Sequence, residues 1–146
     1  VDLNDQAHQY ARTLAREAKL ADRFSYVTGD IRLLDLEKLL ERKPDIVKMV
    51  GICEYLDDDT ITGIARWISR SAAPGCAIVF NSLCGAHGSD RFFRRVFGLH
   101  MIHRTPEQLN ALLGQAGFAD FQALPEPMGV YHVCVGRKAS APARDS

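Results

Sequence analysis

The chain has 146 residues, of which 47% are hydrophobic and 25% are charged. This composition is typical of one globular domain and unlike that of a disordered segment. The 18 basic and 18 acidic residues cancel, so the formal net charge is zero. Without excess positive charge, neither nucleic acid nor anionic lipid is an expected partner. No apolar run approaches the roughly 18 residues of a membrane span, so no membrane association is expected either.

The four cysteines give no sign of a metal site. None forms a C-x-x-C pair, and their spacings match no zinc template. Three of the four lie inside apolar stretches, where a cysteine behaves as a small buried hydrophobic residue. We therefore predict free, buried cysteines and no bound metal.

Periodicity predicts four elements in the first third of the chain. Apolar residues recur at helical spacing over 5–20, which indicates an amphipathic helix. Residues 24–28 are rich in β-forming side chains and predict a strand. A short helix is expected over 33–40, before Pro44. The mostly apolar run 45–52 is suited to a buried strand.

Helix caps and turns define the middle of the chain. The acidic run 57–59 precedes an apolar stripe at helical spacing over 61–68, so a capped helix is expected there. A Pro-Gly turn follows, and then a strand over 76–80. Residues 105–108 form a capping box with proline at the first helical position, and Gly117 is expected to close that helix.

Two strands, 118–124 and 130–137, are joined by a short link and close the chain as a hairpin. Helices and short apolar strands alternate before this pair, and the pair itself breaks the alternation. The pattern predicts an α/β fold with a mostly parallel sheet, helices on both faces and one antiparallel strand near the C-terminus. The small, polar tail 139–146 is expected to fray, which leaves 1–138 as the domain.

Residues 84–104 are the least regular stretch. Four apolar residues, mostly phenylalanines, lie at near-helical spacing between 92 and 97, and three arginines accompany them at 91, 94 and 95. Two interpretations are equally supported. The stretch is either a lid over a bound substrate or a short helix with an apolar underside and a solvated basic face.

Ligands of such sheets bind outside the carboxyl ends of the strands, so residues that follow strands are candidate site residues. Asp2 follows what resembles the end of a strand, Asp30 follows the strand at 24–28, and Gly51 lies at the end of 45–52. Local alternatives exist for both acids. Asp2 or Asn4 can cap the first helix, and Asp30 can be a turn residue after glycine.

The segments VDLN, VTGDI, PDIVKMVGICEYLDD, GCAIVFNSL and RTPEQLNALLGQAGF follow one another in this order. Each is weak alone, but their order and intervals resemble the class I S-adenosylmethionine-dependent methyltransferase family over nearly the whole chain. Within that family the chain is also similar to a less studied subgroup.

The resemblance implies S-adenosylmethionine as cofactor and a role for five residues. Asp2 corresponds to the acid that accepts hydrogen bonds from both ribose hydroxyls, for which a carboxylate has the two oxygens. Leu3 would pack beside the adenine. Asp30 corresponds to the acid that accepts from the adenine amino group, with Ile31 against the ring. Gly51 and its neighbours correspond to the strand end near the methionine part.

The family's glycine-rich loop has no counterpart, because no two glycines in the chain are separated by one residue. In the family this loop precedes the acid that Asp2 resembles and lets the backbone approach the cofactor. The chain also starts at Val1 instead of Met. We therefore expect a missing N-terminal segment, and an isolated chain that is not a working enzyme.

The resemblance implies methyl transfer to a small-molecule acceptor in the cytoplasm, without assigning a catalytic residue. Candidate substrate residues are Tyr55, His87 and His103, and Glu54 and His100 also lie near the expected site. For each of them a surface or core role is the simpler explanation.

Two other functions stay open. An acid closing the second strand also fits a nicotinamide-dependent oxidoreductase, although no tyrosine has a lysine four residues later. The other alternative is a non-catalytic module that kept the fold and lost the glycine-rich loop. The sequence upstream of Val1 would discriminate among the three.

Overall fold

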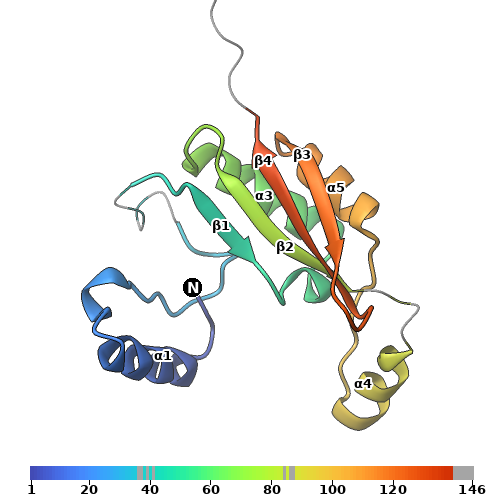
Figure 1. The fold of residues 1–146 in the computed structure, drawn as a ribbon, viewed down its shortest axis with the longest axis horizontal. Coiled ribbons are helices and arrows are strands. Elements are labelled where there is room, and N and C mark those ends of the chain that lie inside the picture. The colour runs from blue at the N-terminus through green and yellow to red at the C-terminus, as the bar shows by residue number, and fades with distance from the viewer. Residues whose placement is uncertain (36–37, 39, 41, 84, 86–87, 140–146) are drawn as a thin grey trace, which may run out of the picture. The chain divides into compact units, whose positions relative to one another are not determined.

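The computed structural model describes residues 1–35, 38, 40, 42–83, 85 and 88–139. It divides into two compact units, Val1–Leu39 and Leu40–Ser146 (Figure 1).

In the first unit, helix α1 spans Asp5–Glu17, which confirms the predicted helix with a C-terminal end three residues earlier. The side chain of Asn4 caps it by accepting the N–H of Gln6 at 2.9 Å. Asp5 places a negative charge in the first turn, where it interacts favourably with the positive end of the helix dipole. A short 3₁₀ helix, η1, follows at Ala21–Arg23.

The predicted strand at 24–28 is wrong. This segment pairs at a single parallel bridge, between Asp2 and Thr28. The N–H of Asp2 donates to the carbonyl of Val27 at 3.1 Å, and the N–H of Gly29 donates to that of Asp2 at 2.9 Å. A strand needs a partner along its length, and the described residues of this unit supply one only at its end. The predicted helix at 33–40 lies partly outside the described residues.

The second unit contains a four-stranded sheet in the order β1-β2-β4-β3 (Figure 1). The strands are β1 (Ile46–Met49), β2 (Ala77–Leu83), β3 (Phe118–Pro125) and β4 (Tyr131–Lys138). β1 and β2 are parallel, whereas β4 is antiparallel to both β2 and β3. Three strands therefore run in one direction and β4 alone is reversed, which confirms the predicted antiparallel strand.

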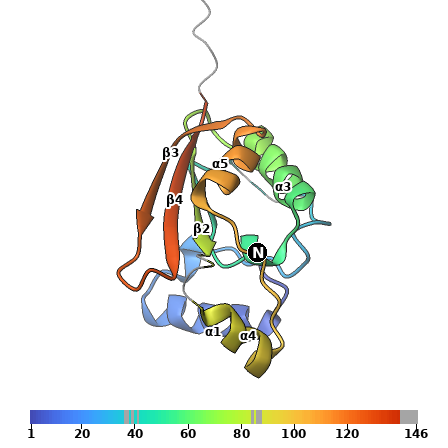
Figure 2. The same cartoon turned by 90° about the vertical axis from the view of Figure 1, so that its right-hand side faces the viewer.

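Two capped helices pack on this sheet, α3 (Asp58–Ser71) and α5 (Pro106–Gly114). The predicted capping box is present: Thr105 Oγ1 accepts the N–H of Gln108 at 3.3 Å, and Gln108 Oε1 accepts the N–H of Thr105 at 2.8 Å. α5 ends at Gly114, before the expected Gly117. Both helices lie on the same face of the sheet (Figure 2), so the described part of this unit supplies one of the two predicted helical layers.

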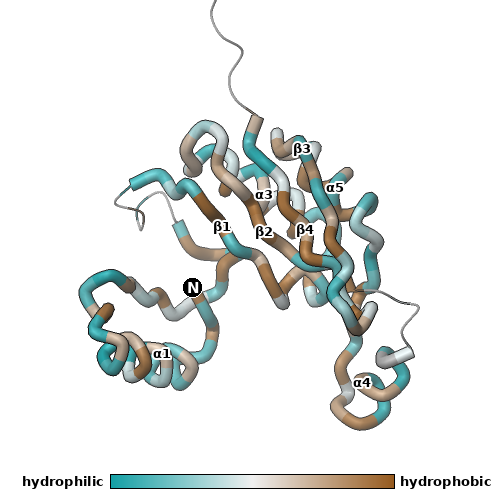
Figure 3. The backbone as a smooth tube through the Cα atoms, viewed as in Figure 1, coloured by the Kyte–Doolittle hydropathy of each residue, from teal (hydrophilic) through white to brown (hydrophobic). Residues whose placement is uncertain are grey.

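The core lies between these two helices and the sheet. Its large, fully buried apolar side chains come from α3, β2, α5 and β4 and include Ile61, Ile78, Phe80, Leu109, Leu113 and Cys134. Figure 3 shows apolar residues along most of β2, the strand between β1 and β4. Burying each large apolar side chain contributes roughly 1.5–3 kcal/mol. Cys53, Cys76 and Cys134 are free and buried, as predicted.

Helix α4 (Ser89–Phe97) forms within the irregular stretch and lies beyond the carboxyl end of β2 (Figures 1 and 2). Gly88 and Gly98 flank it in the left-handed conformation, which glycine adopts without strain. The helix is confirmed, but its expected apolar underside is not buried, because Phe92, Val96 and Phe97 are each more than half exposed. No helix among the described residues is long and apolar enough to cross a membrane.

Candidate functional site

A side-chain hydrogen bond joins the turn after β1 to the neighbouring strand β2. The N–H of Gly51 donates to Oδ1 of the buried Asn81 at 2.6 Å. Gly51 has φ +75°, in the left-handed region where a side chain would be strained. A Cβ at this position would have no atom within 4 Å, so the backbone borders open space. Gly51 is therefore placed where a ligand can approach the main chain.

The short helix η2 (Cys53–Tyr55) follows this turn and orients two candidate residues differently. Tyr55 is 51% exposed, whereas Glu54 is 5% exposed. Glu54 is held through its carbonyl, which accepts the N–H of Ile102 at 2.8 Å. Burial is the largest cause that raises the pKa of Tyr131, and the charges of Glu54 and Tyr55 raise it further.

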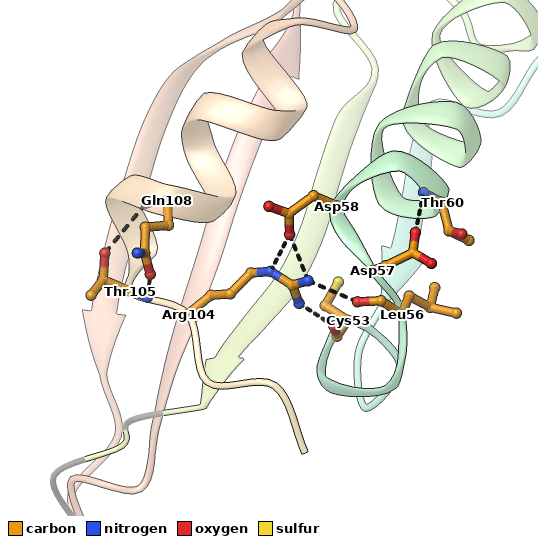
Figure 4. A network of polar contacts seen from close by, with 8 residues as sticks. All are labelled: Cys53, Leu56, Asp57, Asp58, Thr60, Arg104, Thr105 and Gln108. Carbon is orange, nitrogen blue, oxygen red and sulfur yellow. Dashed lines mark hydrogen bonds and ion pairs between the residues drawn. The ribbon is translucent and has the colours of Figure 1, made fainter. Parts of the chain in front are cut away.

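Arg104 holds η2 in place through a buried network (Figure 4). Its Nη1 donates to the carbonyl of Cys53 and its Nη2 to that of Leu56, both at 2.8 Å. Nε donates to Oδ1 of Asp58 at 2.8 Å, and Nη2 pairs with the same oxygen at 2.6 Å. The guanidinium thus satisfies the carbonyls of the first residue of η2 and of the residue after it, together with the first residue of α3.

A pocket of about 250 Å³ lies beside this network, where β2 ends and α5 begins. Its lining includes Ser82, His103, Gln108 and His132. Nε2 of His103 contacts Oδ1 of Asp90 at 3.1 Å. That hydrogen bond, with a second one from Arg94, lowers the pKa of Asp90.

Of the predicted substrate residues that the structure describes, His103 lies at this pocket and the others do not. His103 lines this pocket, and its Nδ1, like that of His132, is buried with no hydrogen-bond partner among the described residues. Tyr55 is not part of the pocket lining, and His100 is exposed. His87 lies outside the described residues.

The first unit contains the other four predicted cofactor residues. The bridge between Asp2 and Thr28 brings the start of the chain beside the segment that leads into Asp30. Asp2 and Leu3 are exposed, and Ile31 is partly exposed. Asp2 Oδ1 accepts the N–H of Asn4 at 2.8 Å. The helix cap itself is Asn4, so the carboxylate of Asp2 orders the residue before the helix.

Asp30 forms a local ion pair with Arg32. Its Oδ1 accepts the backbone N–H and the Nε–H of Arg32, both at 2.9 Å, and Oδ2 pairs with Nη2. The side-chain hydrogen bond is the largest cause that lowers the pKa of Asp30 to about 2. The turn role considered for Asp30 is thus present, and its assignment to the adenine stays a prediction.

Three residues of the second unit were missed as site residues. Arg104 carried no signal except its position just before the capping box. Asn81 directly follows the predicted strand 76–80, and that position was a usable signal for its hydrogen bond to Gly51. His132 lies in the expected last strand, where nothing in the sequence marked it as a site residue. The pairing of β4 with β2 brings it to the pocket.

No protein-family model and no curated protein matches the chain. Solved structures do match. A possible exported protein from Bordetella parapertussis has a TM-score of 0.73 at 24% identity, over 94% of this chain and 52% of that one. An O-methyltransferase family protein from Burkholderia thailandensis has a TM-score of 0.73 at 16% identity, over 96% of this chain and 43% of that one.

A third match is human N-acetylserotonin methyltransferase in complex with S-adenosylmethionine, with a TM-score of 0.56 at 20% identity. It covers 83% of this chain and 37% of the human one. The chain thus spans about half or less of the structures it matches. Their shared architecture includes the mixed sheet with its helices. The chain has the class I S-adenosylmethionine-dependent methyltransferase fold.

Proposed function

We propose that the intact protein transfers a methyl group from S-adenosylmethionine to a small-molecule acceptor, and that residues 1–138 are part of its methyltransferase domain. The observation that supports this most is the sheet order β1-β2-β4-β3 with β4 reversed, in a fold that solved methyltransferases share. Fold likeness alone does not specify chemistry. The residues at the strand ends carry the rest of the argument.

Two groups of residues are suited to the cofactor. In the first unit, Asp2 offers an exposed carboxylate for the ribose hydroxyls, and Asp30 follows the segment paired with it. In the second unit, the backbone of Gly51 borders open space at the end of β1. We assign Asp2, Leu3, Asp30 and Ile31 to the adenosine part and Gly51 to the methionine part.

The acceptor is proposed to occupy the pocket lined by His103 and His132. A pocket of about 250 Å³ is suited to a small molecule and not to a polymer. Methyl transfer from a sulfonium is an in-line displacement that depends chiefly on alignment of donor and acceptor. The cofactor supplies the activated methyl group, and the residues of this chain bind and orient the two reactants. A cytoplasmic location and the lack of nucleic-acid or membrane partners stay predictions.

Titration calorimetry with S-adenosylmethionine tests the proposal. We expect binding by the intact wild-type protein, and a loss of more than about 1 kcal/mol of binding free energy in its Asp2→Ala variant, because two hydroxyl donors lose a charged acceptor. Asp22→Ala in η1 is the matched control, since that acid lies in an exposed turn. A protein that binds NADH but no S-adenosylmethionine would favour the oxidoreductase, and binding of neither would favour a non-catalytic remnant.

A further inference from the structure

The first unit contains a pocket of about 300 Å³, between the C-terminal half of α1 and the residues from η1 onward. Such a volume is within the range of small-molecule sites. The pocket is lined by two arginines, two aromatic residues and two alanines: Arg12, Ala15, Arg16, Ala21, Phe24 and Tyr26. None of the residues assigned above to the cofactor or the acceptor is among these six.

The two arginines of this pocket have no acidic partner. Arg12 and Arg16 are four residues apart on α1, a spacing that makes them neighbours on one face of the helix. No ion pair forms to either of them within the part of the chain that the structure describes. Arg16 donates to the hydroxyl of Thr13 at 3.3 Å. Like charges at this spacing repel each other, so an anion bound between them would offset that repulsion.

Stacking on Tyr26 positions the guanidinium of Arg12. Its Cζ lies 5.0 Å from the centroid of the Tyr26 ring, within the range of a cation–π contact. Tyr26 is itself held by the ring of the buried His8, at a centroid distance of 5.6 Å. The N–H groups of a guanidinium lie in its plane, so a stacked arginine keeps them available for an acceptor. The cation is therefore oriented before any ligand arrives.

Phe24 gives the same pocket an exposed aromatic surface. Its ring stacks on that of Tyr26, with the centroids 6.3 Å apart and an angle of 25° between the planes. Phe24 is nevertheless 54% exposed, which is unfavourable for so large an apolar side chain. The small side chains of Ala15 and Ala21 leave space beside it. The pocket thus combines a surface for a flat apolar ring with two cations.

We propose that this pocket binds a small aromatic anion, with the carboxylate or phosphate of the ligand on Arg12 and Arg16 and its ring against Phe24. The planar fork of a guanidinium matches both kinds of anion, which share this chemistry. The site goes beyond the proposed function and does not depend on methyl transfer. It would make the first unit a binding site for a second small molecule besides the adenosine part of the cofactor.

Calorimetry on the intact protein tests the ligand class with four probes: naphthoate, naphthyl phosphate, naphthol and inorganic phosphate. We expect naphthoate or naphthyl phosphate to bind at least roughly tenfold more tightly than naphthol and inorganic phosphate, because only these two offer a ring and a charged acceptor together. The tighter of the two identifies the anion. Equal affinities for naphthol and the two aromatic anions, or no binding of either anion, would overturn the proposal.

Substitutions locate the binding. Arg12→Gln and Arg16→Gln should each weaken the tighter aromatic anion roughly tenfold and leave the affinity for naphthol unchanged, because each removes charge-assisted hydrogen bonds. Arg12→Lys should recover only part of the loss, since an ammonium lacks the planar fork. Arg66→Gln, which removes an exposed arginine of α3, is the matched control and should bind like the wild type.

Circular dichroism of each variant shows whether α1 remains folded, so a loss of affinity in a folded variant is a loss of ligand contacts. Unchanged affinity in folded Arg12→Gln and Arg16→Gln would place the anion elsewhere and overturn the proposal. An equal loss in Arg66→Gln would do the same, because it would reduce the effect to a general attraction between the ligand and positive charge.

Discussion

The N–H of Gly51, in the turn after β1, donates to Oδ1 of Asn81 in the parallel strand β2 at 2.6 Å. Because Oδ1 is the acceptor, the amide group of Asn81 is oriented, with its NH₂ directed away from Gly51. One side chain thus holds the backbone turn after β1 against β2, in addition to the backbone pairing of the two strands.

Asn81→Leu should destabilise the second unit. The substitution leaves the N–H of Gly51 without its buried partner, at a cost of roughly 1–3 kcal/mol in the free energy of unfolding. Urea unfolding is the measurement. Asn110→Leu on α5 is the matched control, since Oδ1 of Asn110 has no hydrogen-bond partner among the described residues. Equal losses in the two variants would show that the bond to Gly51 contributes nothing.

Arg104→Ala should destabilise the second unit more than Asn81→Leu does, because one guanidinium satisfies the carbonyls of both Cys53 and Leu56. We expect a loss of about 2–4 kcal/mol in the free energy of unfolding, from two unsatisfied carbonyls. Arg104→Lys should recover part of it, because an ammonium cannot bond to all three partners in the same geometry.

Arg94→Ala is the control for this series. Arg94 forms an ion pair with Asp90 on the surface of α4, and exposed pairs contribute little. Denaturant unfolding of the three variants measures these losses. If Arg104→Ala lowered the free energy of unfolding no more than Arg94→Ala does, our account of the Arg104 network would be contradicted.

Elements with a cap or a hydrophobic period could be predicted from sequence. The capping box at Thr105 and the acidic cap at Asp57 mark the starts of α5 and α3, because these local hydrogen bonds depend on neighbouring residues only. The direction of β4 followed from the short link to β3, which only a hairpin can accommodate. Local chemistry determined each of these features.

Features set by distant contacts could not be predicted. Residues 24–28 have strand propensity, but a ladder needs a partner along its length, and Asp2 pairs at one position only. Arg104 reaches carbonyls about fifty residues away, as its bonds to Cys53 and Leu56 show. The burial of Glu54 likewise depends on the packing around η2. No periodic pattern marks such contacts.

Asp30 should titrate far below an ordinary aspartate. The hydrogen bond from the side chain of Arg32 is the largest cause that lowers its pKa from 3.8 to about 2. The folded pKa lies below the unfolded one, so the ion pair stabilises the chain above about pH 4 and is lost as pH falls towards 2. Carbon-detected NMR of the carboxylate measures this directly, and Arg32→Ala should move the pKa of Asp30 back towards 3.8. Equal pKa values in the two proteins would mean that the pair does not form in solution.

Cys53 should resist alkylation until the chain unfolds. Burial is the largest cause that raises the pKa of its thiol from 9.0 to about 11. At pH 8 only about one molecule in a thousand then carries the reactive thiolate, and a residue that is 3% exposed adds a steric barrier. Iodoacetamide labelling followed by peptide mass spectrometry should show Cys53 unmodified in the native protein and modified in denaturant.

The raised pKa of the Cys53 thiol also predicts how the free energy of unfolding changes in alkaline solution. A thiol whose pKa is raised on folding is held neutral in the native state, whereas in the unfolded chain it ionises from about pH 9 upward. Stability is therefore lost as pH rises from about 9 to 11, because ionisation favours the unfolded chain. Cys53→Ala removes this group, so its free energy of unfolding should fall less steeply over that interval than that of the wild type, although it starts lower because of the cavity. Parallel slopes in urea unfolding at pH 8, 9, 10 and 11 would show that the Cys53 thiol is solvated in the native protein.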